Sequence, residues 1–424
     1  MSPTRVDHTD SISSQDPHNE PAKKTKSRRP PNTAFRQQRL KAWQPILTPK
    51  TVLPIFFIVG IIFAPIGGLL LWASSQVQEI ALDYTECIKN SPEVEKVVAG
   101  KADTTQEMPT SRVSASFNMP MTTKPKWGHY SELHDWGTGK NSTQNVCVLV
   151  FTPPNDVKPP ILFYYRLTNF YQNHRRYVKS FDTNQLKGDA VSGADIKSGE
   201  CDPLSTAEDG RPYYPCGLIA NSMFNDTYGE LQVLNAANNP NAKNYTFSKD
   251  NIMWATEKDL YGETKYNPKD IVPPPFWADQ YPADGYDSLN HSQLPNLHTN
   301  QAFQVWMRTA GLPTFSKLAQ KNEHDVLNGT TSYRLTIADH FPVHLYGGTK
   351  SVLISTRTVM GGKNVFLGIA YVVVGGLCVL LGTIFTLTHL IKPRKLGDHT
   401  YLSWNNDQPS TATTTGRAHP NDGA

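Results

Sequence analysis

The chain has 424 residues, of which 38% are hydrophobic and 18% are charged, a balance that excludes a protein disordered throughout and leaves room for more than one domain. Its formal net charge of +4 is unevenly distributed, since residues 1–50 hold ten Lys or Arg against four acidic residues, whereas residues 51–391 hold 27 basic and 30 acidic residues. The excess positive charge therefore flanks apolar stretches, which indicates a membrane surface and argues against nucleic acid as a partner.

Residues 1–31 are rich in Ser, Asp, Pro and Lys and contain few large apolar side chains. Such a segment cannot offset the entropy that is lost on ordering, so we expect a disordered tail. Residues 403–424 have the same composition and end a second tail that we expect over residues 392–424.

The sequence NTAFRQQRLKAWQP predicts a short juxtamembrane helix within residues 32–50, capped at Asn32 or Thr33 and ended by Pro45. One broad face of this helix would collect Phe35, Leu40, Ala42 and Trp43. Two interpretations stay open: the helix lies in the membrane interface, or it packs on the cytosolic domain of a partner. In both cases the candidate contact residues are Phe35, Arg36, Arg39 and Trp43.

Residues 51–75 and residues 364–391 are each apolar enough and long enough to cross a bilayer. The first stretch lies too far from the N-terminus, and is too long, to be the apolar core of a cleaved signal peptide. Basic residues precede the first stretch and follow the second, so the positive-inside rule places both termini in the cytosol. We expect an integral membrane protein whose residues 76–363 form a lumenal or extracellular domain.

The predicted lumenal domain contains four of the five cysteines: Cys87, Cys147, Cys201 and Cys216. An even number in an oxidising compartment predicts two disulfides, with three possible pairings, of which we favour the sequential one. A metal site is disfavoured because neither pair has Cys-x-x-Cys spacing. Cys378 falls within the second apolar stretch, where a free cysteine behaves as a small apolar residue.

The same domain contains five Asn-x-Ser/Thr sequons, and neither predicted cytosolic tail contains one. None of the five has proline at its middle position. We expect most of them to be glycosylated: Asn141, Asn225, Asn244, Asn290 and Asn328.

Short apolar runs bounded by turn residues predict strands over residues 146–152, 161–167, 333–338 and 351–359. Helical periodicity is scarce, and its best short examples are residues 301–309 and 314–320. We therefore expect an α+β membrane protein, with two transmembrane helices and a large, mainly antiparallel-β lumenal domain.

Glycines recur every seven residues from Gly361, just before the second apolar stretch, through Gly368, Gly375 and Gly382 within it. Small residues on one stripe allow a neighbouring helix to approach closely inside lipid. We favour a partner's helix as the neighbour and name Gly368, Gly375 and Gly382 as its contacts; the alternative is the first apolar stretch of the same chain.

No catalytic or nucleotide-binding motif stands out in the sequence, including the phosphorylated Asp-Lys-Thr-Gly of a P-type ATPase. His174 lies between Asn173 and two arginines, a setting more typical of a docking surface than of a general base. Three aspartates near residue 284 lack the spacing of a calcium loop. We expect neither an enzyme nor a bound metal or cofactor.

Several long segments resemble the accessory, or β, subunits of the type-four P-type ATPases, the phospholipid flippases (the Cdc50/Lem3 family). They occur in the family's order and span the chain from residue 32 to residue 391. The segments are NTAFRQQRLKAWQP at 32–45, FYYRLTNFYQNHRRYVKS at 163–180, PCGLIANSMFNDT at 215–227, VWMRTAGLPTFSKL at 305–318 and GGKNVFLGIAY at 361–371.

This resemblance implies a non-catalytic subunit that forms a heterodimer with a flippase ATPase, is needed for the pump to leave the endoplasmic reticulum, and supports phospholipid transport to the cytosolic leaflet. It also implies disulfides Cys87–Cys147 and Cys201–Cys216. The Golgi, endosomes and the plasma membrane all remain candidate destinations. The basic cytosolic segment makes phosphoinositide a candidate ligand beside the bulk phospholipids.

Polar and aromatic groups are dense in one lumenal segment, which we predict to contact the pump: Phe170, Tyr171, Asn173, His174, Arg175, Arg176 and Tyr177.

Two other classes of protein fit the topology less well. A two-span ligand-gated channel subunit usually has more cysteines and a polar pore lining. A doubly anchored ecto-enzyme would need a catalytic constellation.

Overall fold

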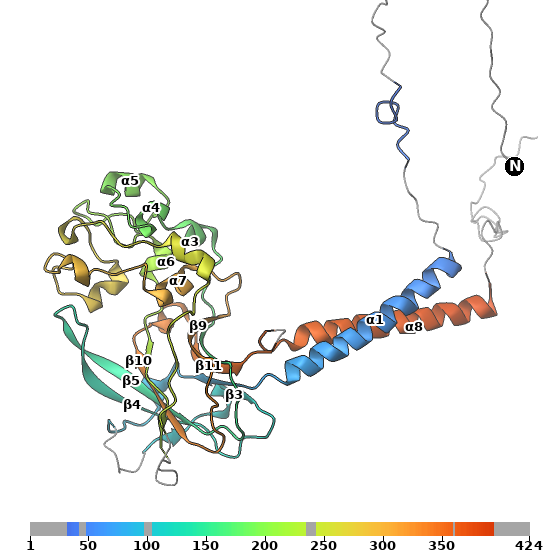
Figure 1. Ribbon diagram of the computed structural model, residues 1–424, viewed down its shortest axis with the longest axis horizontal. Helices are drawn as coiled ribbons and strands as arrows, with labels where there is room; N and C mark the ends of the chain where they lie inside the picture. The colour runs from blue at the N-terminus through green and yellow to red at the C-terminus, as the bar shows by residue number, and fades with distance from the viewer. Residues whose placement is uncertain (1–31, 42–47, 97–103, 235–242, 359–360, 394–424) are drawn as a thin grey trace, which may run out of the picture. The chain divides into compact units, whose positions relative to one another are not determined.

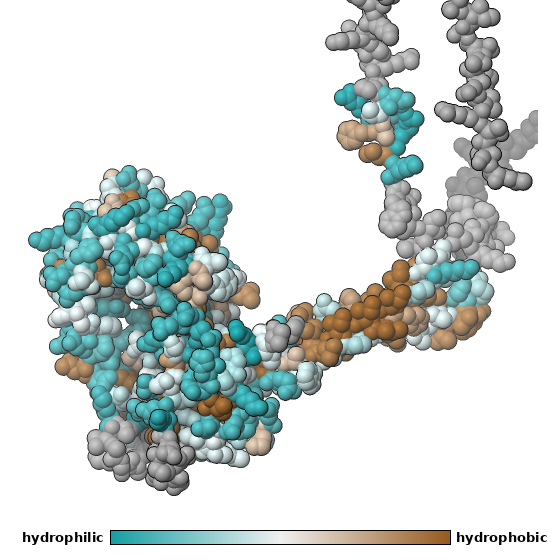
Figure 2. All heavy atoms as spheres, viewed as in Figure 1, coloured by the Kyte–Doolittle hydropathy of each residue, from teal (hydrophilic) through white to brown (hydrophobic). Residues whose placement is uncertain are grey.

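The computed structural model describes residues 32–41, 48–96, 104–234, 243–358 and 361–393. Its two long helices are α1 (Pro49–Ser75) and α8 (Val365–Ile391), and both are long and apolar enough to cross a membrane. Figure 2 shows their surface as largely hydrophobic, whereas the surface of the domain between them is mostly hydrophilic. We call that domain, formed by the described residues between α1 and α8, the β domain.

Two antiparallel sheets form the framework of the β domain (Figure 1). The first has the order β3-β1-β11-β6-β9, and the second has the order β2-β4-β5-β10-β7, with β8 also paired to β10. The strands are β1 (Glu79–Asp83), β2 (Gln106–Glu107), β3 (Val113–Ser116), β4 (Lys126–Asp135), β5 (Asn141–Phe151), β6 (Ile161–Leu167), β7 (Thr227–Tyr228), β8 (Gln232–Val233), β9 (Phe315–Asn322), β10 (Tyr333–Asp339) and β11 (Lys350–Thr356).

Short helices fill the connections, and Figure 1 shows α3 to α7 gathered at one end of the sheets. The α-helices are α2 (Cys87–Asn90), α3 (Arg175–Lys179), α4 (Thr183–Leu186), α5 (Gly193–Ser198), α6 (Leu218–Asn221) and α7 (Gln301–Met307). The 3-10 helices are η1 (Thr110–Arg112), η3 (Ala255–Leu260), η4 (Pro268–Asp270), η5 (Pro275–Gln280), η6 (His291–Gln293) and η7 (Val343–Tyr346).

Apolar side chains from both sheets form one core, which is why the two sheets pack face to face. β5 is buried on both faces: Cys147 and Leu149 point into that core, and Val146 and Val148 join a smaller cluster with Tyr130. A strand covered on both faces carries a continuous apolar run rather than an alternating one. The run at residues 146–152 is of this kind, and the strand prediction there is confirmed.

The other predictions for local structure have mixed outcomes. Strands are confirmed at residues 161–167 and 333–338, and the strand expected over 351–359 is β11, which ends at Thr356. The helix expected over 301–309 is α7. The helix expected over 314–320 is wrong, because that segment is β9 and pairs with β6 from Phe315 to Asn322.

The predicted juxtamembrane helix is also wrong where the structure describes it. Residues 34–38 form a turn, Gln38 has a left-handed φ of 54°, and the Arg39 guanidinium donates to the Asn32 side chain. An isolated helix of so few residues is marginal in water, so local side-chain bonds compete with it. Phe35, Arg36 and Arg39 are exposed; Trp43, residues 1–31 and the tail from residue 394 lie outside the described residues.

Disulfides join Cys87 to Cys147 and Cys201 to Cys216, which is the sequential pairing. The first ties α2 to β5 in the main core, and the second closes a separate small cluster with Ile196. Cys378 is free and partly buried in α8.

Glycines bring α1 and α8 into close contact within the body formed by residues 57–381. A Cβ added to Gly67 would lie 2.7 Å from the backbone nitrogen of Val372 and 2.9 Å from the carbonyl oxygen of Gly368. A Cβ added to Gly375 would lie 2.8 Å from the backbone nitrogen of Ala64. The glycines Gly368 and Gly375 thus face α1 of the same chain, and their assignment to a partner's helix is wrong. Gly382 is buried in the end of α8.

Gly67→Ala is expected to destabilise the detergent-solubilised protein, while the neighbouring Gly68→Ala is not. Both changes raise helix propensity by about 1 kcal/mol, but only the first places a methyl group against the backbone of α8, since nothing lies within 4 Å of Gly68. Overpacking of this kind costs about 1–3 kcal/mol. Thermal unfolding of the two variants in one detergent measures the difference, and equal midpoints would contradict the packing.

Candidate partner-binding surface

The segment predicted to contact a partner, residues 170–177, runs from the loop after β6 into α3. Its side chains divide into two groups. Phe170 and Tyr177 are partly buried and pack against the core. The exposed members are Tyr171, Asn173, His174, Arg175 and Arg176.

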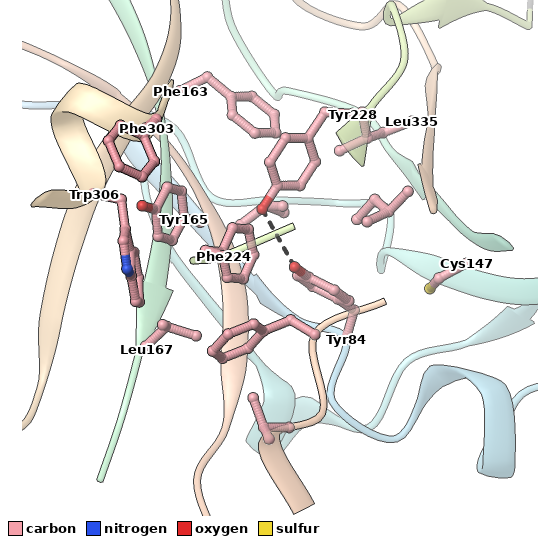
Figure 3. Close-up of a cluster of buried hydrophobic side chains, with 14 of the residues drawn as sticks. Tyr84, Cys147, Phe163, Tyr165, Leu167, Phe224, Tyr228, Phe303, Trp306 and Leu335 are labelled. Carbon is pink, nitrogen blue, oxygen red and sulfur yellow. Dashed lines mark hydrogen bonds between the residues drawn. The ribbon is translucent and has the colours of Figure 1, made fainter. Parts of the chain in front are cut away.

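Phe170 is the anchor of this segment. Its ring lies 5.1 Å from that of Tyr346 and 5.7 Å from that of Trp306, in edge-to-face geometry. These rings belong to an aromatic cluster that Figure 3 shows around Tyr165, Phe224 and Trp306, with Tyr165 and Phe224 stacked at 4.1 Å. Phe170 is therefore a structural contact between loops rather than a free contact for a partner.

Three loops meet at Phe170 and are bonded to one another. The Phe170 amide donates to the Pro313 carbonyl at 3.1 Å, the Asn173 side chain donates to the Gly311 carbonyl at 3.0 Å, and the Asn169 side chain donates to the Tyr346 carbonyl at 2.7 Å. Each loop carries one strongly exposed apolar side chain, namely Tyr171 (57%), Leu312 (70%) and Leu345 (63%). We call these three side chains the apolar loop surface.

A buried ion cluster fixes the loop that carries Leu345. The Lys350 ammonium lies 2.7 Å from an oxygen of Asp226 and 2.6 Å from one of Asp339, and it also donates to the Phe341 carbonyl at 2.8 Å. The other oxygen of Asp226 accepts the backbone N–H groups of His340 and Phe341 at 2.7 and 2.6 Å. Both side chains of the Lys350–Asp226 pair are at most 2% exposed, so water screens their charges very little.

The hydroxyl of Tyr84 completes this cluster by donating to Asp226 at 2.8 Å, and it lies 3.3 Å from the Tyr228 hydroxyl (Figure 3). Burial, together with the negative charge of Asp226, raises the pKa of Tyr84 well above its usual value. Burial also raises the pKa of Asp339, against the opposing charge of Lys350. Burial lowers the pKa of the adjacent His340, so the neutral imidazole is favoured.

α3 carries the basic side chains of the predicted segment on an exposed face. Arg176 pairs with Asp202 at 2.8 Å and Lys179 pairs with Glu200 at 3.7 Å. All four side chains are more than half exposed, so these pairs contribute little to stability. They offset the charges of Arg176 and Lys179, so Arg175 contributes the remaining positive charge of α3.

A cavity of about 310 Å³ opens beside Leu345 and is bounded by η5 and η7. Its lining includes the aromatic side chains Trp136, Phe276 and Tyr346 and the polar side chains Asn225 and His340. The amide oxygen of Asn225 and the hydroxyl of Tyr346 are buried and have no hydrogen-bond partner among the described residues.

Several other polar side chains have partners within the β domain. Among the described residues no cluster of three or more His, Cys, Asp or Glu could hold a metal ion. Of the aspartates near residue 284, Asp287 pairs with Arg211 at 2.6 Å, and Asp284 accepts from Ser288. Lys317 is buried beneath α7, whose C-terminal carbonyls it binds.

The partner contacts predicted from the sequence and the side chains of the apolar loop surface overlap only in part. The sequence named Tyr171 and the residues of α3 as candidates, but not Leu312, Leu345 or the ion cluster. Asp226 and Leu312 both lie within segments that carry the family resemblance, yet isolated leucines and a lone aspartate give no local signal of their role. Only the fold brings residues 171, 312 and 345 together.

Comparison with known protein families matches residues 70–395 to the family described as "LEM3 (ligand-effect modulator 3) family / CDC50 family". The matched range holds the whole β domain and α8. The chain belongs to the CDC50/LEM3 family.

Relatives within the CDC50/LEM3 family align over nearly the full length. The chain is 42% identical to the phospholipid-transporting ATPase accessory subunit CRF1 of Saccharomyces cerevisiae, over 91% of both chains. It is 40% identical to the phospholipid-transporting ATPase accessory subunit CDC50 of Chaetomium thermophilum, over 90% of this chain and 92% of that protein. It is 39% identical to mouse cell cycle control protein 50A, over 87% of this chain and 91% of the relative.

Proposed function

We propose that this chain is the non-catalytic subunit of a type-four P-type ATPase that transports phospholipid to the cytosolic leaflet and so maintains lipid asymmetry. The observation that carries the proposal is the 40–42% identity, over nine-tenths of both chains, to proteins named as accessory subunits of phospholipid-transporting ATPases. The identity extends through both long helices and the β domain, so an entire architecture is shared rather than one motif.

The faces available to a catalytic subunit support this proposal. Of the 18 consecutive residues that are most apolar in each helix, only 11% in α1 and 17% in α8 are buried within the chain. Most of each helix is therefore free to contact lipid or another helix. The apolar loop surface adds a second region, outside these helices. Exposed apolar side chains grouped on a rigid support are typical of protein interfaces.

We also propose a membrane topology and a route of maturation for the chain. Both termini would lie in the cytosol, the β domain would be lumenal and glycosylated, and association with the ATPase would be required for the complex to leave the endoplasmic reticulum for the Golgi, endosomes or plasma membrane. The exposed Arg36 and Arg39 would contact the cytosolic partner or anionic lipid, phosphoinositide included. The family match gives no support to a two-span channel subunit.

Affinity purification of the tagged chain in mild detergent, followed by mass spectrometry, tests the proposal directly. A P-type ATPase recovered in a 1:1 ratio is the expected result. Recovery of the chain only as a homo-oligomer would contradict the subunit role. Removing residues 32–41 then tests the cytosolic contact separately, since an unchanged yield and ATPase cycle would exclude it.

A charge on the apolar loop surface is expected to weaken ATPase recovery at least tenfold without unfolding the chain. Tyr171→Asp and Leu345→Asp each replace an exposed apolar contact by a carboxylate that must be desolvated in an interface. Leu133→Asp is the matched control, because Leu133 is 72% exposed on β4 and lies outside this surface. Equal recovery for all three variants would place the contact elsewhere.

A further inference from the structure

One sequon differs from the other four in its surroundings. Asn141, Asn244, Asn290 and Asn328 are exposed, whereas Asn225 is partly buried and lines the cavity beside η5 and η7. Its neighbours in the chain, Phe224 and Asp226, are both buried, and Asp226 is fixed by the ion cluster. The backbone on both sides of Asn225 is therefore held, and its side chain has little freedom to leave the cavity.

The chemistry of this cavity suits a single sugar ring. Its volume of about 310 Å³ lies at the lower end of the range for small-ligand sites. The side chain of Phe276 remains 55% exposed, and Trp136 is partly buried, so both offer apolar ring surface to the C–H face of a pyranose. The polar side chains of Asp279 and Gln280 also line the cavity and can bond to the hydroxyl or acetamide groups of a sugar.

A glycan on Asn225 would be tethered at the wall of the cavity. Covalent attachment makes the encounter intramolecular, so even weak stacking and a few hydrogen bonds suffice to keep the first sugar in place. The sequon's Thr227 is exposed and pairs through its backbone with Ala338 in β10, which fixes the direction in which the chain leaves the site.

We propose that Asn225 carries an N-linked glycan whose first N-acetylglucosamine packs into this cavity against Trp136 and Phe276. The sugar then acts as an intramolecular ligand that completes the packing between η5 and η7. This assignment concerns the β domain alone and does not depend on the identity of the partner.

The test is site-resolved removal of glycans from the folded, full-length glycoprotein in mild detergent by an amidase that cleaves at the asparagine. Conversion of each asparagine to aspartate in heavy-oxygen water is followed by mass spectrometry, with the other occupied sequons as internal controls. Release at Asn225 is expected to be at least tenfold slower than at the exposed sites, and equally fast after denaturation. An unmodified Asn225, or release at the rate of the exposed sites, would overturn the proposal.

Variants of the lining separate specific packing from general steric shielding. Trp136→Ala and Phe276→Ala are expected to abolish most of the protection, whereas Leu133→Ala, on the exposed face of β4, should preserve it. Protection that survives in both lining variants would show that the rings do not hold the sugar.

A second measurement remains decisive even if a lining variant fails to fold. An endoglycosidase that leaves one N-acetylglucosamine on each asparagine should not change the thermal midpoint, whereas Thr227→Ala, which removes the sequon, should lower it by several degrees. Thr227→Ser retains the sequon and is the matched control. A loss of stability on trimming to one sugar, or none in Thr227→Ala, would contradict a role for the first sugar.

Discussion

Replacing Lys350 by Met is expected to destabilise the β domain by about 3–5 kcal/mol, because it leaves two buried carboxylates without their cation. Asp226 and Asp339 would then face each other where water is largely excluded. Folded domains are stable by only about 5–15 kcal/mol, so this single change removes much of the stability. In cells we expect most of the variant to be retained in the endoplasmic reticulum.

Asp226→Asn is expected to have an effect of similar size. It retains one oxygen for the backbone N–H groups of His340 and Phe341, but it turns an amide toward the Lys350 ammonium and removes that cation's most buried partner. The sequon at Asn225 survives, because its middle position accepts any residue except proline. Glycosylation is thus held constant while the charge changes.

Chemical unfolding of the purified protein, followed by tryptophan fluorescence, measures both variants. The control is Lys265→Met, which breaks an exposed pair with Asp189 and should cost less than about 1 kcal/mol. The double variant Asp226→Asn with Lys350→Met should be less destabilised than the sum of the two single changes, since Lys350→Met leaves one unpaired carboxylate instead of two once Asp226 is an amide. Strict additivity, or a Lys350→Met effect as small as that of the control, would contradict the central role of the ion cluster.

The parts of the fold that were predictable from the sequence are those whose signal is local. The runs that form β5, β6 and β10 combine β-branched and aromatic residues between turn residues, and α1 and α8 are uninterrupted apolar stretches. The order of the four cysteines of the β domain and the family resemblance both favoured the pairing that the structure contains.

β9 shows why local signals failed elsewhere. The side chains that it buries include Lys317, Gln320 and Asn322, which a periodicity argument assigns to solvent. Their polar groups find partners from distant segments, such as the carbonyl of Thr246 for Asn322. A strand that buries polar side chains has no apolar alternation, so tertiary contacts overrode the helical pattern.

The candidate site was only partly predictable for the same reason. The exposure of Tyr171 and of α3 agrees with a polar, aromatic segment in a loop. By contrast, Leu312 and Leu345 lie near Tyr171 only because hydrogen bonds from Asn173 and Asn169 hold their loops beside Phe170. The glycine spacing of α8 predicted a close contact with another helix, but spacing does not show whether that helix belongs to the same chain.

Raising the pH from 6.5 to 8.5 is expected to stabilise the protein relative to a Lys317→Met variant. The Lys317 side chain is buried, and its amine nitrogen lies 3.2, 2.5 and 2.6 Å from the carbonyl oxygens of Val305, Trp306 and Arg308, at the C-terminal end of α7. It therefore satisfies carbonyls that the helix leaves without partners. Among the described residues no carboxylate forms an ion pair with this amine.

Burial, and secondly the positive charge of Arg308, lower the pKa of Lys317 to about 6. In the unfolded chain a lysine titrates near 10.4, so between these values the unfolded state binds about one more proton than the folded state. The free energy of unfolding then rises with pH by about 1.4 kcal/mol per unit. The unfavourable contribution of Lys317 is full below pH 6 and disappears as the pH approaches 10.

Lys317→Met removes this titration and also takes the amine away from three carbonyl oxygens, of which its neutral form can bond two at a time; this loss gives a cost that does not depend on pH. The informative quantity is therefore the slope: the stability of the wild type minus that of the variant should grow by about 2–3 kcal/mol over these two pH units. Denaturant unfolding at several pH values measures it, with Lys265→Met as the control for losing an exposed lysine. A difference that stays constant with pH would mean that the amine remains protonated in the folded state, held by the three carbonyl oxygens alone.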